Sequence, residues 1–395
     1  MTKELAINAG SSTLKWTLFE MPAKKVLARG LVDRINLPES TFTAKIPGDT
    51  KYQVTQDNIS YNLAATMLLD YLKDAHLVEH LHEITGIGHR VVAGGEAFQD
   101  SAIIDDKNLE MIRNLSDYAP LHNPIQARFI EIFQKLLPEA GQVAVFDTSL
   151  YAKMPKSNFL YPIPYEYYTE YGVRKYGAHG TSHRFVSHRA AKILGKDFNK
   201  LKMITCHLGS GSSITAFKDG QVIDTSMGFT PLGGVMMATR SGDIDASIVD
   251  FLATKLNKSV GDINDILNRK SGLLGISGIS PDQRDLENAE DTDKRAKLAL
   301  KMYVNRVVRF IGSYIAELGG LDVLVFTAGS GENGILLRER IMKQLEWYGV
   351  KLDESKNNIR GQEQIISTDD SSVTAMVVPT NEELMIVEDV ERLLN

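Results

Sequence analysis

The sequence predicts an α/β protein that contains two related domains. Two stretches share one layout, in which a short apolar strand enters a Gly/Ser-rich turn and a second strand leaves it, at residues 5–19 and 203–217. Between and after them, short apolar strands alternate with amphipathic helical patterns, which is typical of α/β folds. The two copies lie roughly half a chain apart, so we interpret them as the duplication of a whole domain.

Composition favours a globular protein that binds or converts a small molecule. The chain has 395 residues, of which 43% are apolar and 24% charged, as in an ordinary globular protein of two or three domains. Its net charge of −6 argues against nucleic acid as the main partner. The single cysteine, Cys206, excludes a disulfide framework, and neither a signal peptide nor a membrane-length apolar run is found. These features predict a cytoplasmic protein without a membrane partner.

The first hairpin opens a β-meander over residues 4–35. Leu5–Ile7 is a short strand, Asn8–Thr13 is a polar turn, and Leu14–Phe19 is the next strand. A third strand is expected near Val26–Val32. Lys15 follows the turn and is expected to point back toward whatever the turn binds.

The second hairpin is the clearer anion-binding candidate. An apolar strand, 203–206, leads into His207-Leu208-Gly209-Ser210-Gly211, and a strand over 214–217 follows. The two glycines let backbone N–H groups converge on one point, where a phosphate can be held. An ordinary Gly-rich hairpin is the alternative, and the matching first copy favours the phosphate loop.

Two buried strands in the first half deliver charged residues at their carboxyl ends. Residues 84–92 form one strand with Arg90 near its end, and residues 143–146 form another that precedes Asp147. A buried arginine requires a partner, and active sites of parallel α/β sheets lie at this edge. We therefore favour anion binding over a structural ion pair for Arg90, and a catalytic or metal-linked carboxylate over a helix cap for Asp147.

The second half supplies further candidates. His179 lies between glycines at the start of a helix, and Arg240 lies in a stretch rich in Gly, Ser and Asp. A long amphipathic helix is expected at about 293–318. The strand 321–326 then enters a Gly-rich segment and a further helix, and the last strand, 373–378, precedes a terminal helix with Glu382 near its start.

Two interpretations of the glycine-rich segments compete. The spacing Gly329-x-Gly331-x-x-Gly334 matches a dinucleotide fingerprint, with Asp353 about 20 residues further on. However, too little chain follows for a dinucleotide-binding fold, and the two hairpins would remain unexplained. Patterns for a P-loop and for a serine-hydrolase elbow are absent from the sequence. Two hairpin-opened domains plus a strand–glycine–helix segment fit the actin-like ATPase (ribonuclease H-like) fold, with a cleft between its domains.

Within that fold, the sequence resembles the acetate kinase family along essentially the whole chain. The motifs occur in family order: AINAGSSTLK, GHRVV, APLHNP, VFDT, YGAHGTSH, CHLGSGSSITAFKDG, MGFTPL, TRSGDID and TNEEL. The resemblance implies an enzyme that reversibly transfers the γ-phosphoryl group of ATP to acetate, giving acetyl phosphate and ADP. It implies Mg²⁺ as cofactor, with Mn²⁺ as a substitute, and a homodimer formed through the second domain. The implied domains are 1–150 with 383–395, and 151–382.

The resemblance also implies residue roles. Arg90 would bind the acetate carboxylate, because a guanidinium fork matches it bidentately. Arg240 and His179 would stabilise charge on the transferring phosphoryl group, and Asp147 would take an orienting, metal-linked catalytic position. The Mg²⁺-associated positions are Asn8 and Glu382. The acetate methyl would meet Val92, Leu121 and Pro231, and the nucleotide would meet Lys15, His207, Leu208, Gly209, Ser210, Gly211, Asp282, Gln283, Arg284, Gly329, Ser330, Gly331, Glu332 and Asn333.

Departures from the family pattern leave alternatives open. Ala178 stands where relatives often have Phe, so the methyl pocket could be larger and could accept propionate. Ser210 stands where Asn is common. The alternatives are a propionate or butyrate kinase of the same family, a non-catalytic actin-like or chaperone-type ATPase, and a dinucleotide oxidoreductase.

Overall fold

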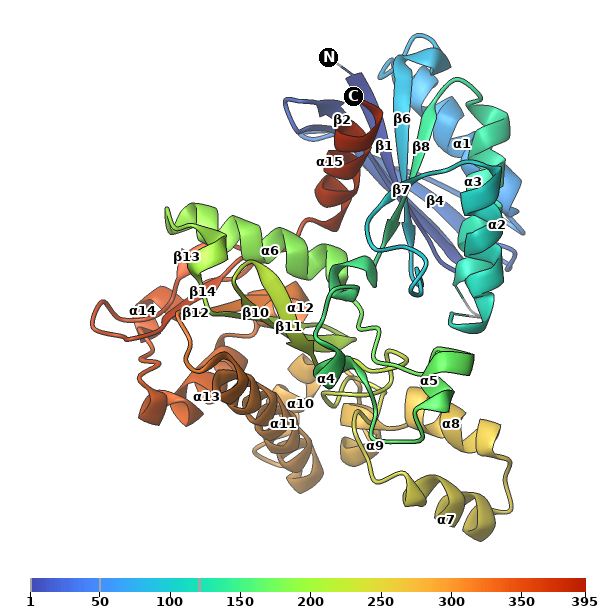
Figure 1. Cartoon of the computed structure of the whole chain (residues 1–395). Coiled ribbons are helices and arrows are strands. Elements are labelled where there is room, and N and C mark those ends of the chain that lie inside the picture. Colours follow the sequence, from blue (N-terminus) through green and yellow to red (C-terminus); the bar gives the residue numbers. More distant parts are fainter. Residues whose placement is uncertain (1, 50, 120–121) are drawn as a thin grey trace. The chain divides into compact units, whose positions relative to one another are not determined.

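The computed structural model describes residues 2–49, 51–119 and 122–395 (Figure 1). The chain divides into two compact units. The N-terminal unit comprises Met1–Ala152 with Asn381–Asn395, and the C-terminal unit comprises Lys153–Thr380.

The N-terminal unit contains an eight-stranded mixed sheet of order β5-β4-β3-β2-β1-β6-β8-β7. Strands β1 to β5 form an antiparallel meander, and β6 and β8 run parallel to β1. The meander therefore extends two strands beyond the three predicted from sequence. The strands are β1 (Thr2–Ala9), β2 (Thr13–Met21), β3 (Lys25–Asp33), β4 (Ser40–Lys45), β5 (Tyr52–Gln56), β6 (Ile84–Val91), β7 (Ala102–Ile103) and β8 (Gly141–Phe146).

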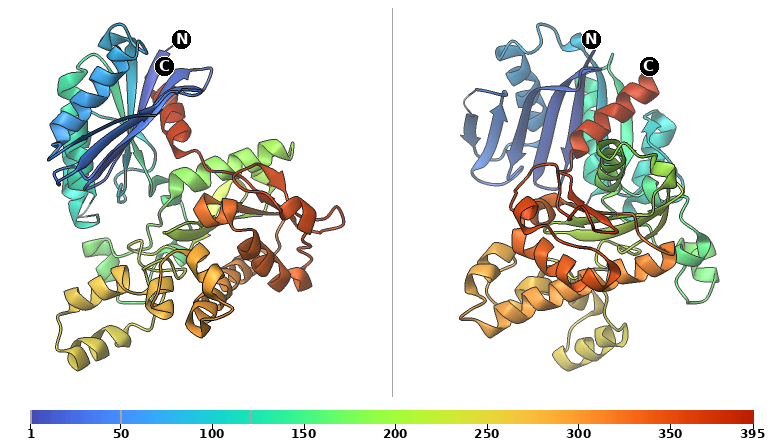
Figure 2. Two further views of the ribbon diagram at one scale, coloured as in Figure 1. Left: turned by 180° about the vertical axis from the view of Figure 1, so that it is seen from behind. Right: turned by 90° about the vertical axis from the view of Figure 1, so that its left-hand side faces the viewer.

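Helices cover both faces of this sheet (Figures 1 and 2). On one face, Leu5 and Ile7 of β1 pack in a core with α1 (Tyr61–Asp74) and α3 (Asn123–Leu136). On the other, Ala6 packs against α15 (Glu382–Leu394). The shorter helices of the unit are α2 (Asp106–Asn114) and the 3₁₀ turns η1 (Leu81–Glu83), η2 (Leu115–Asp117) and η3 (Ser149–Tyr151).

A glycine fixes how closely α15 approaches the sheet. A Cβ atom added at Gly88 of β6 would lie 2.2 Å from the Ile386 side chain of α15. Real side chains do not tolerate such a contact, so only glycine permits this approach. The residues at the start of α15 are thereby held against the sheet.

The C-terminal unit repeats the central topology of the first. Its six-stranded sheet has the order β11-β10-β9-β12-β14-β13, with an antiparallel β9–β10–β11 meander and β12 and β14 parallel to β9. The arrangement β3-β2-β1-β6-β8 of the first sheet has the same directions. The predicted α/β fold with two related sheets is confirmed. The strands are β9 (Met203–Leu208), β10 (Ser212–Lys218), β11 (Gln221–Thr225), β12 (Val323–Thr327), β13 (Gln364–Ile365) and β14 (Thr374–Val377).

The long helix expected near 293–318 is α11 (Lys294–Leu318), and its apolar face lies in the core of this unit. Asp293 caps it by accepting hydrogen bonds from two backbone N–H groups of the first turn. The other helices are α4 (Lys156–Phe159), α5 (Glu166–Tyr171), α6 (Gly180–Ile193), η4 (Phe198–Lys200), α7 (Ser247–Leu256), α8 (Val260–Arg269), α9 (Gly272–Ser277), α10 (Gln283–Ala289), α12 (Ala328–Asn333), α13 (Ile335–Gln344), η5 (Glu346–Tyr348) and α14 (Glu354–Asn357).

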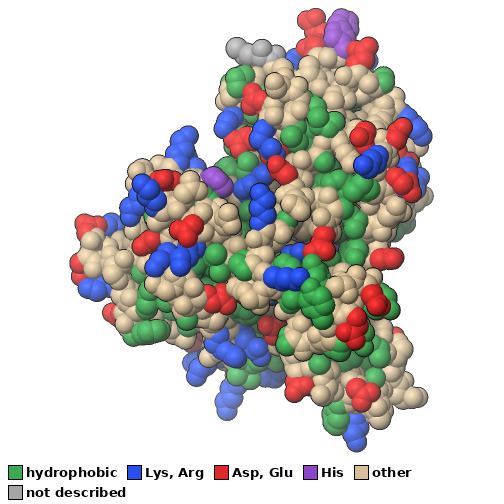
Figure 3. Space-filling model, viewed as in Figure 1, with side chains coloured by type: hydrophobic (Ala, Val, Ile, Leu, Met, Phe, Trp, Pro, Cys, Tyr) green, Lys and Arg blue, Asp and Glu red, His purple; other side chains and the backbone are tan. Residues whose placement is uncertain are grey.

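The molecular surface carries mixed charge. On the face drawn in Figure 3, basic side chains are interspersed with acidic ones. Among the described residues, no helix combines the length and apolar character needed to cross a bilayer.

Candidate active site

In the N-terminal unit, Arg90 and Asp147 form an ion pair at the carboxyl ends of two adjacent parallel strands. Arg90 belongs to β6 and Asp147 directly follows β8. Arg90 Nε lies 3.1 and 3.0 Å from the two carboxylate oxygens, and Nη2 lies 2.5 Å from Oδ2. Burial lowers the pKa of Arg90, but the Asp147 carboxylate outweighs this and holds that pKa above its usual value. The ion pair that sequence reasoning ranked second is thus present, and it orients the guanidinium.

Asn8 joins this pair from the end of β1. Arg90 Nη1 donates to Asn8 Oδ1 at 3.2 Å. Asn8 and Lys15 face each other in the β1–β2 register, and the Gly10 N–H closes the turn between them by bonding to Thr13 O at 2.8 Å. The first predicted hairpin therefore leads directly to the strand-end charges.

Glu382 interacts with the same charges from the first turn of α15. The Asn381 side chain caps this helix by accepting from the Leu384 N–H at 3.0 Å. Burial raises the pKa of Glu382 to about 7; Arg90 opposes this and Asp147 reinforces it. Burial and the neighbouring carboxylate therefore disfavour the ionised form of Glu382 more than Arg90 stabilises it.

Two buried amide side chains of α3 hold the backbone that follows Arg90. Gln126 Oε1 accepts from the Val92 N–H at 3.0 Å, and Asn123 Oδ1 accepts from the Ala93 N–H at 3.1 Å. Asn123 Nδ2 returns a bond to Ala93 O at 2.9 Å. These bonds fix the backbone that follows Arg90, including the predicted pocket residue Val92. The other pocket residue of this region, Leu121, lies outside the described residues.

In the C-terminal unit, three histidines form a linked cluster. His179 adopts a left-handed backbone (φ 60°) at the start of α6, and its ring stacks on His207 with centroids 4.0 Å apart. His179 Nδ1 lies 2.8 Å from Ser213 Oγ, and His183 Nε2 contacts the same hydroxyl at 2.7 Å. Burial and His207 hold the pKa of His183 well below its usual value, so His183 is neutral. Ser213 thus connects a buried histidine to the predicted catalytic one.

Arg240 lies beside this cluster. A Cβ atom added at Gly211 would lie 3.4 Å from His179 Nε2 and 3.5 Å from Arg240 Nη1, so both side chains converge on the second hairpin loop. Nη1 donates to Pro231 O at 3.3 Å, which places the predicted pocket residue Pro231 next to the guanidinium. Burial lowers the pKa of Arg240, and no carboxylate pairs with it among the described residues.

Most predicted nucleotide residues meet at one cavity of about 640 Å³ in the C-terminal unit. The second hairpin and the Gly-rich segment are adjacent because β9 and β12 pair in parallel. A volume of this size suits a drug-sized or cofactor-sized ligand. The predicted residues that line it are Gly209, Ser210, Asp282, Gln283, Arg284, Gly329, Ser330 and Asn333.

The remaining predicted nucleotide residues do not line this cavity. Leu208 packs in the core, and Gly331 O accepts from the buried Arg338 at 2.9 Å. Glu332 turns back to the protein, where its Oε1 accepts from the N–H groups of Ala328 and Thr380 at 2.7 and 3.0 Å. The His207 ring stacks on the His179 ring. Lys15 belongs to the N-terminal unit.

Sequence reasoning missed several residues of this site. His183 follows His179 by one helical turn, and that spacing was the available signal. Leu336 and Arg360 line the cavity, and Arg360 Nη1 donates to Asn333 O at 2.6 Å. Neither stands in a recognisable motif, so only the folded chain brings them to the loop.

The chain matches a known protein family and known relatives along almost its whole length. A family model described as the acetokinase family matches residues 3–388. Acetate kinase 1 of Latilactobacillus sakei is 61% identical over 393 residues, and the acetate kinase of Lacticaseibacillus paracasei is 58% identical over 395 residues. Both alignments cover 100% of each chain.

Solved structures give the same result. The crystal structure of Porphyromonas gingivalis acetate kinase superposes with a TM-score of 0.96 at 42% identity. A propionate kinase from Francisella tularensis superposes with a TM-score of 0.93, also at 42% identity. Each comparison covers 100% of both chains.

Proposed function

The chain belongs to the acetokinase family and is an enzyme with acetate kinase activity, and we propose that it transfers the γ-phosphoryl group of ATP to acetate reversibly with the residues described above. The observation that carries this proposal is Arg240. Its guanidinium is largely buried, lies beside the phosphate-loop glycine Gly211, and has no carboxylate to neutralise it among the described residues. Such an arginine can stabilise the negative charge that develops on a transferring phosphoryl group.

The nucleotide would occupy the cavity of the C-terminal unit. Gly209 and Ser210 of the second hairpin and Gly329 and Ser330 of α12 line it, and Gly/Ser-rich segments of this kind are typical of phosphate binding. Leu336 and Ala238 add apolar contact surface. This arrangement supports a role for the loop in positioning the donor, while chemistry is left to the arginine and histidine side chains.

Acetate would bind through Arg90. The Nε edge of its guanidinium is engaged by Asp147, which holds the group in one orientation. N–H donors on Nη1 and Nη2 beyond those bonds could then meet the substrate carboxylate. Asp147 thus acts chiefly by orientation, because acetate at neutral pH has no proton to lose. His179 would donate to the transferring group while Ser213 fixes its ring.

The residues around Glu382 fit Mg²⁺. Asn8, Asp147 and Glu382 offer amide and carboxylate oxygens, which are the ligands this ion takes. The raised pKa of Glu382 means that a cation beside it would relieve an electrostatic penalty. The described residues contain no group of three or more His, Cys, Asp or Glu placed to hold a metal, and Mg²⁺ is commonly held by one or two carboxylates plus substrate phosphates. When bound, Mg²⁺ (or Mn²⁺) would neutralise charge on those phosphates.

A hydroxamate assay tests the proposal against its alternatives. With hydroxylamine present, acetate, ATP and Mg²⁺ should yield acetohydroxamate only if a carboxyl group receives the phosphoryl group, because hydroxylamine then displaces phosphate from acetyl phosphate. ATP binding without hydroxamate would favour a non-catalytic actin-like or chaperone-type ATPase, and binding of NAD in place of ATP would favour an oxidoreductase.

Replacing Glu382 with glutamine should raise the Mg²⁺ concentration needed for half-maximal activity by about tenfold or more, because one anionic ligand is lost. The matched control is Glu388→Gln, on the same helix, whose carboxylate pairs with Lys24. Titrating activity against Mg²⁺ for both variants measures the effect. An unchanged Mg²⁺ requirement in Glu382→Gln would remove this residue from the metal site.

The pocket around Ala178 should accept propionate. Ala178 is buried beside Met227 and Met237, and a methylene discriminates by only about 1–3 kcal/mol. We expect kcat/KM for acetate to exceed that for propionate by less than about a thousandfold, and Ala178→Phe to increase the ratio. A wild-type ratio above that limit would contradict the enlarged pocket.

Helix α7 supports a homodimer. None of its residues is buried, although six of the ten are apolar; Phe251 and Leu256 are 58% and 50% exposed, and Val260 of α8 is 64% exposed. An exposed apolar patch of this kind typically marks a protein interface. Phe251→Asp should therefore convert a dimer to monomers in sedimentation velocity. Trp347→Asp, at another exposed aromatic (76%), should leave the dimer intact; a wild-type monomer would refute the interface.

We further propose that the enzyme acts in the cytoplasm. Its one cysteine, Cys206, is buried and forms no disulfide, and burial raises the pKa of its thiol. A protein of this composition needs no oxidising compartment to fold.

A further inference from the structure

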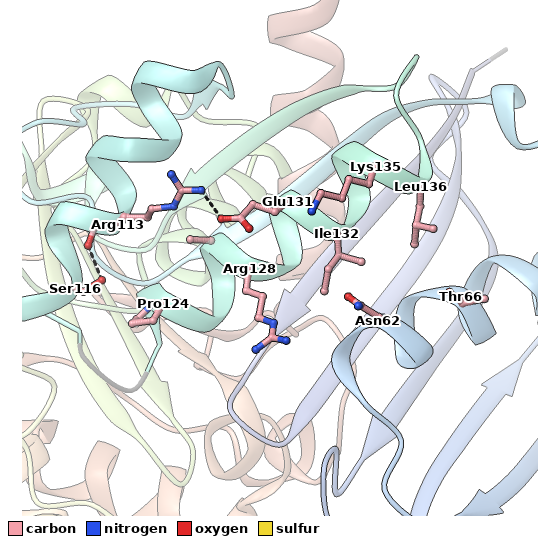
Figure 4. Close-up of a pocket in the computed structure, with 11 residues that line it drawn as sticks. Asn62, Thr66, Arg113, Ser116, Pro124, Arg128, Glu131, Ile132, Lys135 and Leu136 are labelled. Atoms are coloured by element: carbon pink, nitrogen blue, oxygen red, sulfur yellow. Dashed lines mark hydrogen bonds and ion pairs between the residues drawn. The ribbon is translucent and has the colours of Figure 1, made fainter.

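A second cavity lies in the N-terminal unit, away from every residue assigned to catalysis. It has a volume of about 790 Å³ and lies between α1, α3 and the end of α2 (Figure 4). Its apolar wall includes Ala127 and Ile132, which are almost completely buried. Asn62 and Thr66 of α1 supply polar side chains on the side opposite α3. Most of its other lining residues are polar or charged, and its volume lies in the range of small-molecule sites.

The charges that line this cavity are predominantly basic. Arg113 is neutralised by Glu131, which also lines the cavity, and by Glu110 at 2.9 Å. Arg128 and Lys135 have no carboxylate partner among the described residues. With Glu110 included, the charged groups in and beside the cavity have a net charge of +1, in a protein whose net charge is −6.

These two cations are arranged along one side of α3. Arg128 and Lys135 are seven residues apart, which is about 10 Å along a helix axis. The Arg128 guanidinium lies 5.1 Å from the centre of the Tyr61 ring, a cation–π contact that restrains it beside the cavity. The lysine stem is flexible, so the two charges can adjust to a ligand of intermediate length.

Helices α1 and α3, which line this cavity, also hold backbone segments close to Arg90 and Asn8. The buried side of α3 carries Asn123 and Gln126, which hold the backbone of residues 92 and 93. Tyr61, which contacts Arg128, donates its hydroxyl to Ser11 O at 2.8 Å, within the Asn8–Thr13 turn. A ligand that moves Arg128 or α3 would act on both anchors.

We propose that this cavity binds a small organic dianion, with a carboxylate or phosphate at each end, and that this ligand changes the affinity of the enzyme for its acceptor carboxylate. Arg128 would hold one anionic end and Lys135 the other, with Asn62 and Thr66 bonding the polar body. This regulatory site is additional to the proposed function. By linkage, the acceptor must change the affinity for the dianion by the same factor.

Calorimetric titration with 3-phosphoglycerate tests the binding, because that probe carries one carboxylate and one phosphate. The full-length enzyme is first saturated with acetate and MgADP, which cannot react together and which occupy the active site. We expect one bound dianion per chain. The double variant Arg128→Gln/Lys135→Gln should weaken binding at least about tenfold, whereas Lys107→Gln, an exposed lysine of α2 outside the cavity, should not. Absence of binding, or equal binding by the double variant, would overturn the site.

The regulatory part of the proposal has a separate readout. KM for acetate should change at least about twofold when the wild type is saturated with 3-phosphoglycerate, and should not change in the double variant. The double variant without the probe should keep wild-type kcat. Binding without any change in KM would overturn the effector role. Because the titration needs no turnover, its failure is distinguishable from a failure of the kinase assignment.

Discussion

Replacing Arg240 with alanine is expected to lower kcat by about 10³- to 10⁵-fold, the range seen for arginines that neutralise a transferring phosphoryl group. The loss should fall on kcat more than on KM, because the interaction strengthens as charge develops on the equatorial oxygens. Folding should be little affected, since the hydrogen bonds of this guanidinium to described residues are those to the Pro231 carbonyl and, over a longer distance, to the Met237 sulfur. Steady-state kinetics with saturating ATP and acetate measure the change.

Two further variants isolate the role of Arg240. Arg240→Lys keeps a positive charge without the planar fork and should recover only part of the rate. Arg269→Ala removes an exposed arginine of α8, which is 67% exposed and pairs with Asp265, and should leave kcat unchanged. A kcat within tenfold of wild type in Arg240→Ala would exclude it from the mechanism.

Replacing Arg90 with alanine should impair both catalysis and stability. The acceptor carboxylate loses its bidentate partner, so KM for acetate should rise by about two orders of magnitude, as for a lost charge-assisted pair. Asp147, whose side chain is 2% exposed, would lose the guanidinium that balances its buried charge. Breaking such a pair costs about 3–5 kcal/mol of unfolding free energy. Acetate saturation curves and thermal melting measure the two effects.

A double variant separates these two effects. Arg90→Gln/Asp147→Asn removes both charges together, so neither member of the ion pair stays charged without the other, and most of the stability should return. Activity should stay low, because neither the carboxylate clamp nor its orienting partner is present. Wild-type activity in this double variant would show that the ion pair is only structural.

The sequence allowed the two hairpins and the strand-end charges to be predicted from local patterns. Apolar strands end at Arg90 and at Asp147, and parallel strands bring their carboxyl ends to one sheet edge. Whether the two side chains bind each other depends on strand register and side-chain rotamers, which no local pattern encodes. The sequence therefore indicated that both residues lie at this sheet edge but ranked the ion pair second.

Other features depend on tertiary contacts that sequence patterns do not reveal. Strand β5 is exposed along most of its length, so it lacks the apolar alternation that marks a strand. Ser213 stood in the second hairpin as a turn residue, yet its hydroxyl joins two histidines from another segment. Glu332, predicted to meet the nucleotide, instead accepts backbone hydrogen bonds, because its short helix turns the side chain inward.

We propose that the C-terminal unit holds the nucleotide and that Arg90 of the N-terminal unit holds the acceptor carboxylate. The most direct test is the affinity of Arg90→Ala for a non-hydrolysable ATP analogue with Mg²⁺, measured by calorimetry beside its KM for acetate. We expect an analogue affinity within about twofold of wild type, a difference well below 1 kcal/mol, while KM for acetate rises. A loss of nucleotide affinity as large as the rise in KM would contradict it.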